Sequence, residues 1–164
     1  MPSATATFRV GDRVVYPHHG AAVIKSKEDR EFQGETKEYF ILRLAYGDLT
    51  LMVPTDQTEE VGIRDVIARD ELDKVFKVLK SKECRTPTNW SRRFKTHVEK
   101  LRSGDIYQVA EVVRNLARRE AEKGLSAGEK RMLTKARQIL TSEVVFAANV
   151  DEEEAGRMLD KVLA

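Results

Sequence analysis

The sequence predicts an α+β protein of two domains: a small antiparallel β barrel of the Tudor or SH3 type, followed by an all-α bundle of about five helices. Two patterns support this division. Short runs of β-branched and aromatic residues, separated by glycine and proline, fill residues 8–54, whereas apolar residues recur at helical spacing after residue 69. We therefore expect domains at 1–58 and 69–164, joined by a connector at 59–68.

Charge divides the chain in a similar way. Residues 1–67 carry 8 Lys/Arg against 11 Asp/Glu, residues 68–144 carry 19 against 11, and residues 145–164 carry 2 against 5. The basic middle block suits a polyanion such as a nucleic acid, although a solvated helical surface accounts for the charge equally well. The acidic end has a simpler explanation, because acids in the first turn of a helix favour its positive end.

Composition excludes several classes of protein. Of the 164 residues, 41% are hydrophobic, which is enough for a core and too many for a disordered chain. No apolar run approaches the ~18 residues of a transmembrane helix. Residues 1–7 are small and polar, unlike a signal peptide, and we expect them to be a loose end. The single cysteine, Cys84, cannot form an internal disulfide, which suits a reducing cytoplasm.

Four strands are expected in the N-terminal domain, at residues 13–16, 20–32, 37–45 and 49–53. The turns between them carry proline, glycine or aspartate, at residues 17–20, 33–35 and 47–48. In the third strand, Phe40, Leu42 and Leu44 alternate with a mixed set of side chains, so these three should face the core. A domain of this kind usually offers an edge or a face to a partner.

The sequence carries no clear catalytic or metal-binding pattern. His18 and His19 are adjacent, so on an extended segment their side chains point apart, and a role in the turn accounts for them. The glycines are isolated turn residues rather than a phosphate-binding loop, and spacing supports neither an acid–base pair nor a Cys84–His97 pair. We therefore expect no enzyme activity, no metal and no cofactor.

Five helices are expected after the connector, each beginning at a capping residue. The expected caps are Asp70, Thr88, Asp105, Asp151 and Ser126, the last in a capping box with Glu129. Apolar residues on one face of three of the helices form the expected core: Leu72, Val75, Phe76 and Leu79; Ile106, Val109, Val113 and Leu116; Met132, Leu133, Ala136 and Leu140. Three arginines should lie elsewhere on the surface of the third helix: Arg114, Arg118 and Arg119.

Trp90 is the only tryptophan of the chain, and its position allows two interpretations. On a helix it shares a face with apolar residues, which favours burial: Phe94, Val98 and Leu101. It also lies in the first turn, beside cations: Arg92, Arg93 and Lys95. An apolar side chain among phosphate-binding cations is typical of a wedge that parts a base step in the minor groove. The residues alone leave open a wedge, an architectural DNA-binding protein, and a protein adaptor with a buried tryptophan.

Three segments of the chain carry a resemblance: VGDRVVYPHHG at residues 10–20, PTNWSRR at 87–93 and GLSAGEKRML at 124–133. In this order they strongly resemble the CarD family of bacterial RNA polymerase-binding transcription regulators, with an actinobacterial character. The N-terminal module of that family also occurs in the transcription-repair coupling factor. The resemblance implies a Tudor-like domain that docks on the polymerase β subunit. It also implies a helical domain whose tryptophan enters the minor groove at the upstream edge of the melted promoter and stabilises the open complex.

The resemblance further implies the residues of two sites. Those expected to contact DNA are Trp90, Arg92, Arg93, Lys95, Arg119 and Lys130. Arg30 and Met52 are expected on the polymerase side, and Met52 stands near a position where mycobacterial relatives carry arginine, which implies weaker or differently packed docking. The expected partners are promoter DNA and polymerase holoenzyme with its housekeeping sigma factor, and no membrane. We expect a cytoplasmic monomer that joins the nucleoid through polymerase.

Overall fold

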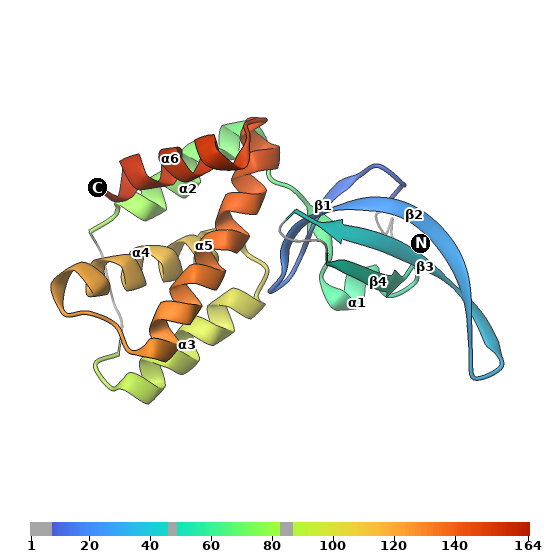
Figure 1. Cartoon of the computed structure of the whole chain (residues 1–164), viewed down its shortest axis with the longest axis horizontal. Helices are drawn as coiled ribbons and strands as arrows, with labels where there is room; N and C mark the ends of the chain where they lie inside the picture. Colours follow the sequence, from blue (N-terminus) through green and yellow to red (C-terminus); the bar gives the residue numbers. More distant parts are fainter. Residues whose placement is uncertain (1–7, 46–48, 83–86) are drawn as a thin grey trace.

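The β sheet and the helices occupy opposite ends of an elongated molecule (Figure 1). This computed structural model describes residues 8–45, 49–82 and 87–164. The expected loose end at 1–7, the expected turn at 47–48 and Cys84 lie outside these residues. The predicted α+β fold, with strands first and helices after, is confirmed.

The N-terminal part is a five-stranded antiparallel sheet with the order β4-β3-β2-β1-β5. The strands are β1 (Arg13–Tyr16), β2 (Gly20–Phe32), β3 (Glu35–Leu44), β4 (Thr50–Pro54) and β5 (Arg64–Asp65). The first four confirm the predicted strands, with small differences at their ends. The expectation that β4 is the last strand is wrong, because β5 follows the short helix α1 (Thr58–Val61) and pairs with β1. A two-residue strand leaves no alternating pattern in a sequence, so only its pairing reveals it.

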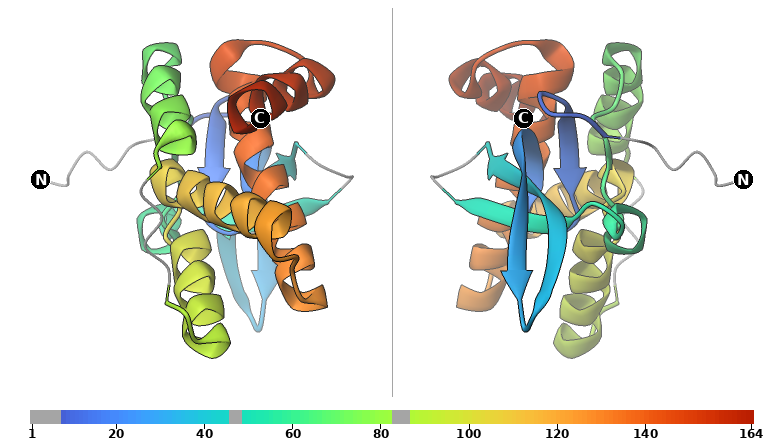
Figure 2. Two further views of the ribbon diagram at one scale, coloured as in Figure 1. Left: turned by 90° about the vertical axis from the view of Figure 1, so that its left-hand side faces the viewer. Right: turned by 90° about the vertical axis from the view of Figure 1, so that its right-hand side faces the viewer.

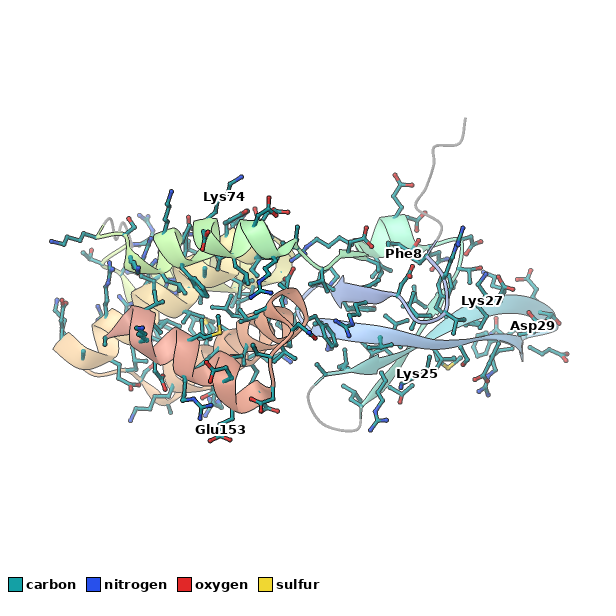
Figure 3. The ribbon with its side chains drawn as sticks, turned by 90° about the horizontal axis from the view of Figure 1, so that it is seen from above. Phe8, Lys25, Lys27, Asp29, Lys74 and Glu153 are labelled. Atoms are coloured by element: carbon teal, nitrogen blue, oxygen red, sulfur yellow. The ribbon has the colours of Figure 1, made fainter. Side chains whose placement is uncertain are left out.

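The core of the barrel contains the side chains that the alternation of β3 predicts. Phe40, Leu42 and Leu44 are all buried. Other elements contribute to the same cluster: Phe8, Val14, Ile24, Val53 and Ile63. Phe8 lies close to α1 and the strands in Figure 3, at the beginning of the described chain. The predicted Tudor-like barrel is therefore confirmed.

Strands β2 and β3 continue beyond the barrel as a two-stranded arm. Their pairing runs from Lys27↔Phe40 to Phe32↔Glu35, and the arm reaches away from the rest of the molecule (Figures 1 and 2). Phe32, near its tip, is 68% exposed. The predicted hairpin turn is confirmed by positive φ at Gln33 and Gly34. Because no element in the described part of the chain covers the arm, both of its faces are exposed along most of its length.

The C-terminal part begins with a 3-10 turn, η1, and continues with the five expected helices. The 3-10 turn η1 spans Arg69–Glu71. The five helices are α2 (Leu72–Lys80), α3 (Trp90–Arg102), α4 (Ile106–Glu122), α5 (Ala127–Ala148) and α6 (Glu152–Leu163). The predicted apolar faces meet in one core, although Phe76 and Leu133 lie only at its border. Lys74 projects from α2 away from this core (Figure 3). None of the helices that the structure describes is both long and apolar enough to span a membrane.

Three of the five predicted helix caps are confirmed, at Asp105, Ser126 and Asp151. The cap of α3 is Asn89 rather than Thr88, since the Asn89 side chain accepts a 3.1 Å hydrogen bond from the Arg92 amide. Adjacent Thr and Asn can both serve as caps, and the backbone path into the helix decides between them. Asp70 does not cap α2, because it lies inside η1.

The expectation that Arg114 lies on the surface is wrong. Arg114 is only 7% exposed, and its guanidinium donates a 3.0 Å hydrogen bond to the Val78 carbonyl. Arg118 donates to the carbonyls of Leu79 and Lys80. Carbonyls in the last turn of a helix have no partners within it, so these two arginines of α4 satisfy the end of α2.

The sheet packs against α5 at the start of β2, directly after the turn between β1 and β2. The Ala21 amide donates a 2.9 Å hydrogen bond to Ser142 Oγ, and a Cβ added to Gly20 would lie 2.7 Å from the same oxygen. Nearby, both carboxylate oxygens of Glu143 accept 2.7 Å hydrogen bonds from Arg64. These contacts fix the barrel against the helices.

His18 and His19 lie in this turn, as expected. His18 adopts a φ of 71°, and the His19 ring contacts Tyr16 edge-on. Burial, followed by the charge of Lys135, lowers the pKa of both imidazoles. Across the described residues, His, Cys, Asp and Glu side chains form no cluster of three or more that could hold a metal ion.

Candidate nucleic-acid interface

Trp90 is the first residue of α3 and lies at the surface, with 45% of its area exposed. Its ring stacks on Phe94, with centroids 4.9 Å apart and planes inclined by 20°. Along the same face Val98 is partly buried and Leu101 fully so. The predicted apolar face of α3 is thus buried at the C-terminal end of the helix and exposed at Trp90, at its N-terminal end. Of the two interpretations left open by the sequence, burial of the tryptophan is wrong.

The indole is held from a second side by the beginning of α5. Its Nε1 donates a 3.1 Å hydrogen bond to Ser126 Oγ. A Cβ added to Gly128 would lie 3.4 Å from the Phe94 ring and 3.9 Å from the Trp90 ring, so this glycine lets the α5 backbone approach both. An exposed aromatic side chain is therefore fixed in orientation by a stack, a hydrogen bond and a backbone surface.

Ser126 belongs to a chain of polar contacts that runs back to α3. Its hydroxyl also accepts from the Glu129 amide at 3.2 Å and donates to Glu129 Oε1 at 3.3 Å. Glu129 Oε2 accepts a 2.9 Å hydrogen bond from Arg93 Nε, and Arg93 Nη1 donates to the Thr88 carbonyl. The chain ties the start of α3 to the start of α5, with Trp90 at its exposed end.

The Arg93–Glu129 pair lies in the interior, where each residue is 2% exposed. Burial raises the pKa of the Glu129 carboxyl, but the hydrogen bond and charge of Arg93, together with the bonds from Ser126, outweigh it and lower the pKa below its usual value. Glu129 is therefore an anion paired with a guanidinium. The predicted capping box is altered accordingly, since the carboxylate binds Arg93 and the Ser126 hydroxyl.

The expected DNA-contacting cations have different surroundings. Arg92 and Lys95 on α3 and Lys130 on α5 are exposed. Arg119 on α4 is partly buried and lines a cavity that it shares with Arg93. Arg93 itself offers almost no surface to a phosphate, so the structure does not fit the expectation of a direct contact.

Sequence reasoning missed the residues that hold Trp90. Asn89, Ser126, Gly128 and Glu129 contact the tryptophan or its supports, yet in the sequence they read only as helix-start residues. Both segments, 87–93 and 124–133, carry the family resemblance. That shared resemblance is the one sequence signal that could have indicated a contact between them.

The two residues expected on the polymerase side share one face of the sheet. Ile41 pairs with Ser26 on β2 and with Met52 on β4, and alternation places Arg30 on the same side as Ser26. This outer face is opposite to the core face of Phe40. Met52 is 45% exposed, and Arg30 forms a 2.7 Å ion pair with Glu28.

These features define a class of protein in which a Tudor-like barrel with an exposed outer face is joined to a helical domain that presents one fixed aromatic residue beside cations. Comparison with known proteins agrees with that class. The CarD-like/TRCF RID domain matches residues 8–67, and the CarD C-terminal domain matches residues 74–160. A Bacillus subtilis (strain 168) protein named "Putative transcription factor YdeB" is 35% identical over 147 residues, which cover 90% of this chain and 96% of that protein. The chain belongs to the CarD family.

Proposed function

We propose that this protein regulates transcription by docking on the β subunit of RNA polymerase and stabilising the promoter open complex. In this proposal Trp90 enters the minor groove at the upstream edge of the melted region. The observation that carries the proposal is the exposed indole, which is clamped between Phe94, Ser126 and Gly128 rather than buried. The name of the B. subtilis relative, a transcription factor, supports the same role.

Rigidity favours the wedge over a loosely attached surface residue. A side chain that is already fixed loses little conformational entropy when it inserts between bases, so more of the stacking energy stabilises the complex. The exposed cations Arg92, Lys95 and Lys130 would hold the DNA backbone on either side. In our proposal Arg93 positions Trp90 through Glu129 and does not bind DNA directly.

Docking would use the outer face of the barrel. Arg30 and Met52 share that face, and β4 forms one edge of the sheet, where a partner strand could be added. We propose residues 1–58 as the docking domain, 59–68 as a connector that adds β5 to the sheet, and 69–164 as the DNA-binding domain. Docking raises the effective concentration of the wedge at the promoter, which compensates for the cost of unstacking a base step.

The lifetime of the open complex tests the proposal. On a ribosomal-type promoter, with polymerase and its housekeeping sigma factor, the wild-type protein should lengthen that lifetime. Trp90→Ala should bind polymerase normally but shorten the lifetime by roughly tenfold relative to wild type, because it removes one aromatic stack on a base. Trp90→Phe, which keeps a ring, should lie between the two.

Equal lifetimes for wild type and Trp90→Ala, with both proteins bound to polymerase, would rule out the wedge. Tight duplex binding without polymerase, with a steep salt dependence, would indicate an independent architectural DNA-binding protein instead.

A further inference from the structure

A cavity of about 320 Å³ lies between α3 and α4, behind the start of α3. We refer to it as the α3–α4 cavity. Its lining includes His97 from α3 and Arg119 from α4, together with Lys82, Arg118, Glu122 and Lys123. The volume is at the small end of the range of ~300–1,000 Å³ that is typical of ligand sites.

Two side chains in this cavity have polar atoms that the protein leaves unsatisfied. His97 is 1% exposed, and neither Nδ1 nor Nε2 has a hydrogen-bond partner within the described residues. Arg119 Nε is likewise buried and unpartnered in that part of the chain. Because unsatisfied buried polar groups destabilise a fold, their presence around one cavity indicates a ligand that supplies the missing partners.

The charge of the cavity selects an anion. Among the described residues that line the cavity, the cations outnumber the one carboxylate, that of Glu122; they are Lys82, Arg118, Arg119 and Lys123. Arg93 also lines the cavity, but Glu129 neutralises it. Arg118 already donates to two carbonyls of α2, which leaves Arg119 as the guanidinium best placed to bind a ligand.

The imidazole narrows the choice of anion. Burial, and next the charge of Lys100, lowers the pKa of His97 to about 4, so at neutral pH the ring is uncharged. A neutral imidazole has one nitrogen that donates and one that accepts. Its ideal ligand therefore both accepts and donates hydrogen bonds. Hydrogen phosphate and protonated phosphate monoesters do so, whereas sulfate and phosphodiesters only accept.

We propose that the α3–α4 cavity binds a phosphate group, held by Arg119 and His97. The group belongs to inorganic phosphate or to a small phosphate monoester, because the phosphodiesters of the DNA backbone have no hydrogen to donate. This inference stands apart from the proposed function, because it concerns the protein free of polymerase. It also gives Arg119 a role other than the surface contact with DNA that the family resemblance implies.

Nitrogen-15 spectra of the imidazoles test the proposal directly. The chain has three histidines, and His97→Leu identifies the His97 signals. Titration of the full chain at neutral pH with inorganic phosphate should shift the His97 nitrogens to saturation, while sulfate should bind at least roughly tenfold more weakly. Arg119→Gln should weaken phosphate binding by roughly tenfold. Arg131→Gln, at an exposed position on α5 that does not line the cavity, should leave it unchanged.

His97→Leu supplies a second readout. Without phosphate, this variant should unfold at a higher temperature than wild type, because it removes two unsatisfied buried nitrogens. It should also lose the preference for phosphate over sulfate, as followed by amide shifts of α3 and α4. Wild-type phosphate affinity in His97→Leu would overturn the proposal.

A duplex oligonucleotide tests whether the DNA backbone enters the cavity instead of a small phosphate. Saturable shifts of His97 with free phosphate, and none with the duplex, would assign the cavity to a small molecule. Shifts with the duplex, and none with free phosphate, would assign the cavity to the DNA backbone and overturn the proposal. His97 signals that respond to neither, or equal effects of phosphate and sulfate that Arg119→Gln does not change, would overturn the proposal.

Discussion

Arg92 and Arg93 are adjacent and chemically identical, yet their side chains have opposite surroundings. Arg92 is exposed, whereas Arg93 is buried and bound to Glu129 and to the Thr88 carbonyl. Removing one member of a buried ion pair leaves the other charge unpaired in the interior, which costs far more than the loss of a surface charge. The two positions therefore separate the structural role of Arg93 from the DNA-contacting role that we propose for Arg92.

Arg93→Ala should lower the free energy of unfolding by about 3–5 kcal/mol, because the Glu129 carboxylate would remain buried without its partner. Arg92→Ala, the matched control one residue away, should change it by less than ~0.5 kcal/mol. Urea unfolding measures both values. A small effect of Arg93→Ala would contradict the buried pair and return this arginine to the group of possible DNA contacts.

His97 should make the fold sensitive to acid. The pKa of His97 is about 4 in the folded protein, against 6.5 in the unfolded chain. Between pH 6.5 and 4 the imidazole is therefore protonated in the unfolded chain but not in the folded protein. The free energy of unfolding should fall as the pH drops from 6.5 towards 4, by up to about 3 kcal/mol. His97→Leu should flatten this slope in chemical denaturation measured above pH 4.5, where Glu129 stays ionised. Parallel slopes for the two proteins would contradict the lowered pKa.

At the scale of elements, the beginnings of α3 and α5 form one unit around Trp90. Ser126 caps α5, bonds Glu129 and accepts the indole N–H with the same hydroxyl. The helices are joined in sequence only through α4, so their contact depends on how α4 packs between them. The β2–β3 arm and outer sheet face form a second unit, which no described element covers and where we propose that the partner docks.

Arg30→Glu should weaken polymerase binding by roughly tenfold, because it reverses a charge on the same outer face of the sheet as Met52. Lys27→Glu is its matched control: it makes the same change on the same strand, but on the opposite face, where Lys27 lies over the Phe40 ring. Binding of the two variants to the isolated β subunit would be compared by calorimetry. Equal affinities would remove Arg30 from the docking surface.

At the scale of the whole molecule, the barrel is fixed against the helices because the start of β2 packs against α5. Glu143, which is 2% exposed, accepts two hydrogen bonds from Arg64 and one from the Ile67 amide. Arg13 adds a contact over the Phe146 ring. A rigid junction of this kind would let docking of the barrel determine where Trp90 meets DNA.

Gly20→Ala should disrupt this junction. The new Cβ would lie 2.7 Å from Ser142 Oγ and 3.3 Å from the Ile139 backbone, in addition to strain at a φ of +97°. We expect a loss of about 2–5 kcal/mol in the free energy of unfolding. Gly34→Ala, with a φ of +81° and no atom within 4 Å, carries the strain alone and should cost about 1–2 kcal/mol. Thermal unfolding of the two variants would measure the difference, and equal losses would contradict close packing at Gly20.

The sequence by itself determined most of the elements of this protein. Period-two alternation identified the core face of β3, and helical spacing identified the buried faces of α2, α4 and α5. Three of five caps followed from residue type alone. These features are local, because they depend on side chains within a few residues of one another, so the order of residues is sufficient to predict them.

Only the tertiary structure decided which charges and rings are available at the surface. Arg92 and Arg93 look alike in sequence, as do the predicted surface positions of Arg114 and Arg118, and the exposure of Trp90 could not be settled from its helical face. The pairing of β5 with β1 was equally hidden. The physical reason is that burial depends on partners distant in sequence: Glu129 lies 36 residues from Arg93, and Ser126 lies 36 from Trp90.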